Sequence, residues 1–281
     1  MKTILVPYHG SDECEVVVSA AVTVAKKFGS YIEGLFVRAL PPIIAGEGVS
    51  LPGDYLVQIE SEGQQKAEQA ERAYNEIMHS HGVSHGGLAT AGEGLTAGWI
   101  AKEGVEEQVV GEYGRLFDLI VTGRVVRYAD FDWRSTCEAA LFESGRPVLL
   151  VPESLQTSLG RRILVSWNGS TETARALAMS MPLLSLAEQV RVLTVAGAMV
   201  SGPDGEAITR HLKRNGVNAE SVHVERGEPS PGKQILAEAA SFDADLVIKG
   251  AYTHSRLREM IFGGATSHLL TEAKIPLLLV H

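Results

Sequence analysis

The sequence has little of what marks secreted, metal-rich or membrane-spanning proteins. Its 281 residues hold two cysteines, Cys14 and Cys137, too few and too scattered for a disulfide framework or a zinc cluster. No apolar run is long enough to cross a bilayer, and the N-terminus enters a strand pattern without the apolar core of a signal peptide. The net charge of −9 argues against nucleic acid or an anionic membrane as the main partner. We therefore expect a soluble cytoplasmic protein.

What the chain does contain is an internal duplication. Four segments of the first half recur in the same order in the second half, which predicts one domain in each half. We expect an N-terminal domain at residues 1–152, a polar linker at 153–160 and a C-terminal domain at 161–281. The matched pairs are residues 3–11 with 162–170, 92–93 with 227–228, 118–123 with 245–250, and 147–151 with 276–280.

Strand and helix patterns alternate within each half, and the strands are continuous apolar runs, which predicts parallel sheets with helices on both faces. In such sheets a ligand binds beyond the carboxyl ends of the strands, where the strand order reverses. The matched segments after the first and fourth strands of each half fall at those ends. For the first half we expect strands at 3–7, 31–37, 86–91, 118–122 and 147–151, and helices ending near 28, spanning 55–81, and near 105–114 and 134–143.

The chemistry is concentrated in residues 249–266, between a buried strand and a helix expected at 267–272. Gly250 ends the strand, and the Gly263-Gly264 pair meets the start of the helix. Glycines let backbone N–H groups approach an anion, and a helix N-terminus favours negative charge. We interpret the loop as a phosphate cradle. The alternative is two ordinary strand-to-helix turns that need glycine only for their geometry.

A second glycine-rich segment, residues 227–233, has the spacing of a P-loop, but we interpret it as a helix entrance. Gln234 stands where a hydroxyl would hold magnesium, and Pro229 and Pro231 each lack the N–H that such a loop would use. Three histidines cluster near the end of the helix expected at 55–81. We assign them to a solvated surface rather than to a metal site: His79, His81 and His85.

Two pairs of polar or aromatic residues occupy equivalent positions after the first strand of each half. Tyr8 and Trp167 either pack over the strand ends or form the wall of a purine pocket. His9 and Asn168 can each form hydrogen bonds to a ribose or a base. The sequence leaves both interpretations of the aromatic pair open.

Taken together, these segments resemble the universal stress protein family in its tandem two-domain form, and the resemblance covers nearly the whole chain. It implies two Rossmann-like domains of the adenine nucleotide alpha-hydrolase type, each with a five-stranded parallel sheet. It also implies that the domains pair through their last strands as an internal pseudo-dimer, with a homodimer as a further option.

ATP-binding members of that family carry Gly-x-x-Gly, nine residues, then Gly and Ser or Thr. Gly250 and Gly263 match this motif, whereas Thr253 replaces the second glycine and Gly264 replaces the hydroxyl residue. Thr266 is placed to replace that hydroxyl and to cap the helix. The resemblance thus implies a nucleotide site at Ser166, Trp167, Asn168, Val195, Gly250, Thr253, Gly263, Gly264, Ala265 and Thr266.

Three cations are candidates for phosphate counter-charges, with a solvated basic patch as the alternative: Lys249, Arg256 and Arg258. In the first half the corresponding loop has no glycine pair and carries Asp130 and Asp132, which would repel phosphates. We expect that site to be degenerate.

The leading hypothesis is a regulatory stress-response protein that binds ATP or a related adenine nucleotide, with or without Mg²⁺, in its C-terminal domain. A non-nucleotide dimerisation and interaction module is the alternative. A slow ATP hydrolase is the weaker one, because no base or metal ligand is placed for it and no catalytic residue is assigned. The carboxylates available to it are Asp204, Glu225 and Glu228.

Overall fold

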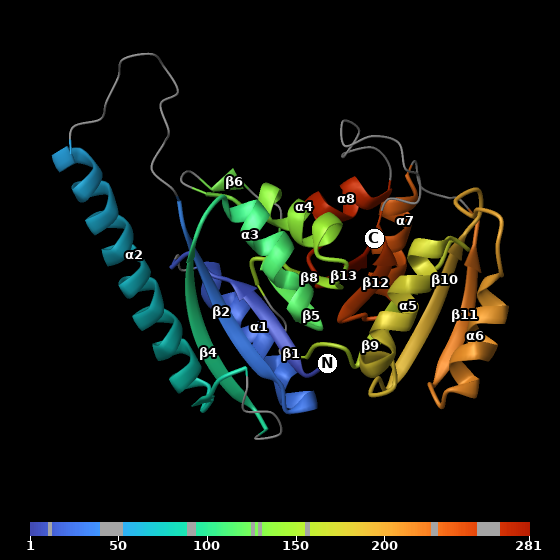
Figure 1. Cartoon of the computed structure of the whole chain (residues 1–281). Helices are drawn as coiled ribbons and strands as arrows, with labels where there is room; N and C mark the ends of the chain where they lie inside the picture. The colour runs from blue at the N-terminus through green and yellow to red at the C-terminus, as the bar shows by residue number, and fades with distance from the viewer. Residues whose placement is uncertain are drawn as a thin grey trace, which may run out of the picture.

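The structure, a computed structural model, describes residues 1–10, 13–39, 53–88, 94–124, 127–128, 131–154, 158–225, 230–251 and 265–281. These residues form one continuous eleven-stranded sheet with helices on both faces (Figure 1). Within the described residues, no helix is both long and apolar enough to span a bilayer.

The first half contains, in order, β1 (Thr3–Pro7), α1 (Glu13–Phe28), β2 (Tyr31–Arg38), α2 (Gly53–Ser80), β3 (Ser84–His85), β4 (Thr96–Glu103), α3 (Glu106–Tyr113), a 3-10 turn (Gly114–Leu116), β5 (Leu119–Gly123), the small hairpin of β6 (Arg127–Tyr128) and β7 (Phe131–Asp132), α4 (Trp133–Glu143) and β8 (Val148–Val151). The second half contains β9 (Arg162–Ser166), α5 (Thr171–Leu184), β10 (Gln189–Val195), α6 (Gly205–Arg214), β11 (Ala219–Val224), α7 (Pro231–Ser241), β12 (Leu246–Gly250), α8 (Ala265–Glu272) and β13 (Leu277–Val280).

The strand order repeats across the two halves and confirms the predicted α/β class. The sheet runs β11-β10-β9-β12-β13-β8-β5-β1-β2-β4-β3. Within each half the neighbouring strands are parallel, whereas β13 and β8 pair antiparallel at the middle of the sheet, with Leu278 opposite Leu149. The chain order therefore reverses beside β9 and beside β1, which puts a candidate crevice at the carboxyl ends of β9 and β12, and another at β1 and β5.

Two apolar layers sandwich this sheet because successive strand side chains point to opposite faces. In β12, Ile248 packs into the layer under α1, α2, α5 and α6, while Val247 packs into the layer under α3, α4, α7 and α8. Each layer draws residues from both halves, so the core is continuous across the β8–β13 pairing. Figure 1 shows the same division of helices between the two faces.

One expected strand was misplaced. Residues 86–88 are not in a strand, and the third long strand of the first half is β4, after the short edge strand β3. Residues 89–93 lie outside the described part of the chain, but they precede β4, so matching residues 92–93 with 227–228 was wrong. Gly104 and Val105 instead join β4 to α3, as residues 225–230 join β11 to α7. Gly98, whose ideal Cβ would lie 2.2 Å from Tyr31 Oη, shows why β4 carries the glycine that hid its strand pattern.

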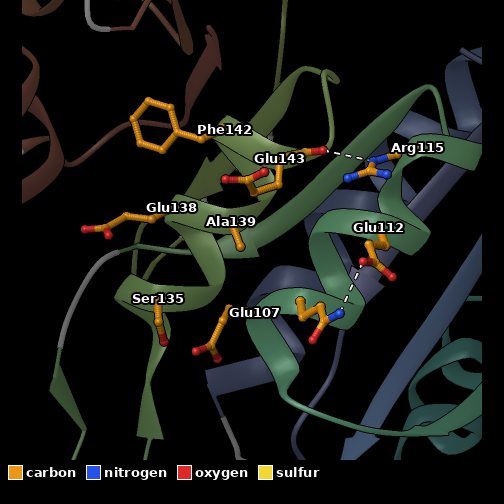
Figure 2. Close-up of a pocket in the computed structure, with 9 residues that line it drawn as sticks. Glu107, Glu112, Arg115, Ser135, Glu138, Ala139, Phe142 and Glu143 are labelled. Atoms are coloured by element: carbon orange, nitrogen blue, oxygen red, sulfur yellow. Dashed lines mark hydrogen bonds between the residues drawn. The ribbon is translucent and has the colours of Figure 1, made fainter. Parts of the chain in front are cut away.

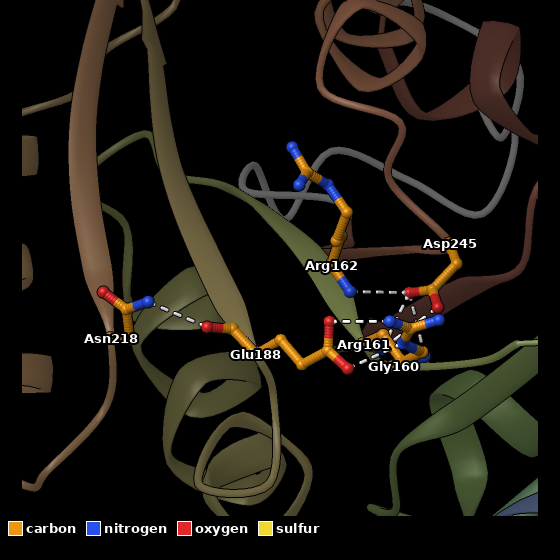
Figure 3. Close-up of polar contacts among 6 residues, drawn as sticks. All are labelled: Gly160, Arg161, Arg162, Glu188, Asn218 and Asp245. Atoms are coloured by element: carbon orange, nitrogen blue, oxygen red, sulfur yellow. Dashed lines mark hydrogen bonds and ion pairs between the residues drawn. The ribbon is translucent and has the colours of Figure 1, made fainter.

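The repeated aspartate before the fourth strand of each half fixes the start of the first strand. The Asp245 carboxylate accepts backbone N–H bonds from Gly160, Arg161 and Arg162 at 2.9–3.1 Å, as Figure 3 shows. Asp118 likewise accepts from the backbone of Lys2 at 2.5 Å and of Thr3 at 3.2 Å. The Asp-Leu dipeptide therefore recurs because it closes the amino ends of the strands. The C-terminal end of the expected linker is packed into the fold, since Leu159 is buried, whereas Glu153 and Ser154 at its other end are exposed.

Candidate functional site

The candidate site begins where β9, β10 and β12 end. Ser166 closes β9 and lies in register with Lys249 of β12, and Val195 closes β10. All three side chains are buried, and strand alternation directs them toward the layer under α7 and α8. The sequence placed the ends of β9 and β12 at one edge of the sheet, and the structure brings Val195, which only the resemblance implied, to the same edge.

Lys249 puts a buried amine at this edge. Burial lowers its pKa to about 8, although the negative charge of Glu172 acts in the opposite direction. Its Nζ donates to the carbonyl oxygen of Gly250 at 2.7 Å. An anion brought beside this amine would favour its charged form, as expected of a phosphate counter-charge.

Gly250 is required by the packing of α5. A Cβ on Gly250 would lie 2.4 Å from the backbone nitrogen of Thr173 and 2.5 Å from the carbonyl carbon of Glu172, both in the first turn of α5. Real Cβ atoms do not come so close to backbone. The close packing of α5 therefore explains by itself why position 250 is a glycine. The presence of this glycine does not by itself indicate a phosphate site.

Asn168 organises the start of α5 rather than leaving its whole amide for a ligand. Its Oδ1 accepts from the backbone nitrogen of Ser170 at 3.1 Å and from Thr173 Oγ1 at 3.0 Å. Ser170 in turn caps α5 by accepting from the Thr173 nitrogen. The carboxamide oxygen is thus engaged in the turn that leads from β9 into the helix.

The side chain of Trp167 is packed in the interior rather than accessible to a ligand. It is 3% exposed, and its indole nitrogen donates to the carbonyl oxygen of Pro203 at 2.8 Å, just before α6. The equivalent Tyr8 is also buried, with ring centroids 5.6 Å from Tyr74 and 5.7 Å from Trp99. This geometry favours the packing interpretation over a purine wall at both positions.

Several predicted site residues lie outside the described residues: Thr253, Arg256, Arg258, Gly263 and Gly264. Ala265 and Thr266 form the first two positions of α8, which begins two residues earlier than expected. Thr266 is therefore inside the helix, and its expected role as the helix cap is wrong.

The comparisons with known proteins follow the same division of the chain. Residues 160–281 match the model of the universal stress protein family. Universal stress protein Slr1230 of Synechocystis sp. is 25% identical over 296 residues, which cover 99% of each chain. Residues 160–281 form a universal stress protein domain, and the whole chain is similar to a universal stress protein.

Solved structures extend the likeness of fold to the whole molecule. A universal stress protein from Archaeoglobus fulgidus superposes with a TM-score of 0.71 at 16% identity, over 99% of this chain and 95% of that one. A functionally unknown protein from Pseudomonas aeruginosa PAO1 gives 0.55 at 14% identity, over 100% and 92%. At these identities the likeness concerns the fold alone.

The first half of the chain has a different polar group in its crevice. His9, after β1, puts Nε2 3.4 Å from Oε1 of Glu106 at the start of α3, and Thr136 of α4 donates to the same carboxylate. Burial lowers the pKa of His9 to about 3 and raises that of Glu106 to about 7. The sequence pointed to His9 but not to Glu106 or Thr136, because their meeting depends on how α3 and α4 pack.

The remaining motifs have structural roles among the described residues. Ser230 caps α7 with Pro231 in its first turn, so the helix-entrance interpretation of the P-loop-like segment is confirmed there. Asp204 caps α6 by accepting from the backbone of Ala207 at 2.7 Å. His81 pairs with Ser19 at 3.1 Å. No cluster of metal-binding side chains occurs in the described part of the chain.

Proposed function

We propose that the C-terminal half of the chain, which matches the universal stress protein family, binds ATP or a related adenine nucleotide and acts in regulation rather than in metabolism. One observation carries the proposal. The buried amine of Lys249 lies at the carboxyl end of β12, beside β9, and the segment that follows β12 leads to the N-terminus of α8. A cation and a helix N-terminus are two features that favour phosphate. In the first half the corresponding edge holds the His9–Glu106–Thr136 cluster instead.

In this proposal, the phosphates bind near Lys249, Gly250 and residues 263–266, with Arg256 and Arg258 as further counter-charges. The base and ribose lie toward Ser166, Asn168 and Val195. Asn168 would use its amide nitrogen or rearrange, because its oxygen already accepts two hydrogen bonds. Trp167 would support the site through packing rather than by stacking on the base. Magnesium would accompany the nucleotide on its phosphates.

The same proposal covers the architecture. Residues 1–152 and 161–281 act as two domains, joined at 153–160, that form an internal pseudo-dimer through β8 and β13. The first domain serves as scaffold and pairing partner, and the protein works in the cytoplasm. The antiparallel pairing of these last strands supports this arrangement.

The test is to measure nucleotide released from the acid-denatured purified protein, followed by calorimetric titration with ATP, ADP and cAMP. A Gly263→Trp variant should abolish the binding, because the indole would fill the loop. Gly87→Trp is the matched control, since nothing lies within 4 Å of a Cβ at Gly87. The proposal fails if no nucleotide is released and no heat is observed at millimolar concentrations.

A non-nucleotide interaction module is the second candidate, and a specific observation favours it. Trp167 and the Asn168 oxygen are both committed to internal hydrogen bonds, and Thr253 replaces a family glycine. A structure determined with excess ATP separates the two candidates. The module predicts a crevice filled by the protein's own residues.

A further inference from the structure

A groove outside the candidate nucleotide site lies between α3 and α4, on the first half of the molecule (Figure 2). It encloses about 460 Å³, within the size range of pockets that accept a ligand or an anchoring side chain. Ala139 and Phe142 contribute apolar surface to it, and four carboxylates surround it: Glu107, Glu112, Glu138 and Glu143.

The walls of this groove are held in a fixed relation. Gly111 of α3 lies so close to α4 that a Cβ there would be 2.8 Å from Glu143 Cβ. Arg115, in the 3-10 turn that follows α3, ties this turn to the end of α4, since its Nε donates to the carbonyl oxygen of Glu143 at 3.1 Å. Phe142 packs edge-on against His281, with ring centroids 4.8 Å apart. The groove is therefore preformed and continuous with the packing between the two halves.

The excess of acidic side chains is found in the first half of the chain and is not shared by the second half. Residues 1–152 carry 21 acidic and 12 basic side chains, whereas residues 153–281 carry 13 of each. The helices α7 and α8 hold the equivalent place in the second half. There the described charges on the helices, and within two residues after them, have mixed sign: Lys233, Glu238, Asp243, Glu272 and Lys274.

We propose that the α3/α4 groove docks a basic amphipathic helix of another protein. An apolar side chain of that helix rests on Ala139 and Phe142, and its lysines or arginines meet the surrounding carboxylates. Helix-in-groove recognition uses this combination of an apolar anchor and flanking charges. A second copy of this acidic chain is the poorer occupant, because its first half would bring a large negative charge to the same surface.

The probe is a fluorescently labelled synthetic helix of leucine and lysine, with a leucine–glutamate helix of the same pattern as its counterpart. We expect the basic helix to bind the full-length protein and its affinity to fall as salt is raised. The acidic helix should not bind. Glu107→Lys combined with Glu112→Lys should weaken binding by about tenfold or more. Ser135→Trp should weaken it without any change of charge, because the indole would occupy the groove.

The matched control is Glu238→Lys combined with Glu272→Lys, which changes the net charge equally but on α7 and α8. Retained binding in this control supports the groove, and equal losses in both double variants would show that the helix senses net charge alone and would overturn the proposal. Circular dichroism and thermal melting verify that every variant is folded. Sedimentation of the protein without any peptide tests the alternative occupant. Dimers that dissociate when Glu107 and Glu112 are mutated would identify a second copy of the chain as the occupant, and this result would also overturn the proposal.

Discussion

At the scale of single residues, Asp245 illustrates how one buried carboxylate fixes a strand. It is 4% exposed and accepts N–H bonds from three successive residues. Asp245→Asn replaces one acceptor oxygen by an NH₂ group that faces N–H donors, which should lower the free energy of unfolding by about 1–3 kcal/mol. Asp118→Asn is the control, because Asp118 is exposed and water can replace its bonds. Urea unfolding of both variants checks this, and equal losses would contradict it.

The buried amine of Lys249 predicts a pH dependence. Its pKa is about 8 in the folded protein and 10.5 when unperturbed. Between these values the unfolded chain binds more protons than the folded one, so this group makes the free energy of unfolding rise with pH across that window, by up to about 3 kcal/mol. Below pH 8 both states are charged, and the cost of burying the charge is fully present.

The measurement compares wild type with Lys249→Met by urea unfolding at several pH values. Lys249→Met should be the more stable protein below pH 8, because it buries no charge, and the difference should shrink as the pH approaches 10.5. Parallel profiles for the two proteins across this window would show that the amine is not desolvated as described.

At the scale of elements, the contact of β12 with α5 depends on Gly250. Gly250→Ala drives a methyl group into the first turn of α5 and should lower the free energy of unfolding by about 1–3 kcal/mol. Gly87→Ala, where a Cβ meets nothing within 4 Å, should change it by less than about 0.5 kcal/mol. Thermal melting distinguishes the two, and a neutral Gly250→Ala would mean that α5 does not pack as tightly as these distances require.

Most elements could be predicted because continuous apolar strands and capped helices leave clear local patterns. The strand β4 could not, since Gly98 interrupts its pattern and the weaker run just before it resembled a strand. Within the candidate site, the segments that contain Ser166 and Lys249 were placed together because strand ends meet at one edge of a parallel sheet, whereas Val195 was implied only by the family resemblance. The internal hydrogen bonds of Trp167 and Asn168 could not be predicted. Their partners are Pro203 and Thr173, whose approach is set by tertiary packing and leaves no local signal.

At the scale of the whole molecule, the duplication indicated two similar halves but not the cohesion between them. The β8–β13 pairing puts Leu149 opposite Leu278 in the middle of the sheet, and both side chains are fully buried. Both apolar layers take residues from each half. The two halves should therefore unfold as one cooperative unit rather than as separate domains.

Leu149→Ala tests this cohesion. The cavity should cost about 2–5 kcal/mol, and because the core is shared, slow amide exchange should accelerate in β9 and β12 as well as in β1 and β5. Hydrogen exchange followed by mass spectrometry reports both halves in one experiment. Leu116→Ala, at a side chain that is 60% exposed, should leave both patterns unchanged. If exchange accelerates in the first half alone, the halves open independently, and the central strand pair joins two units without making them one.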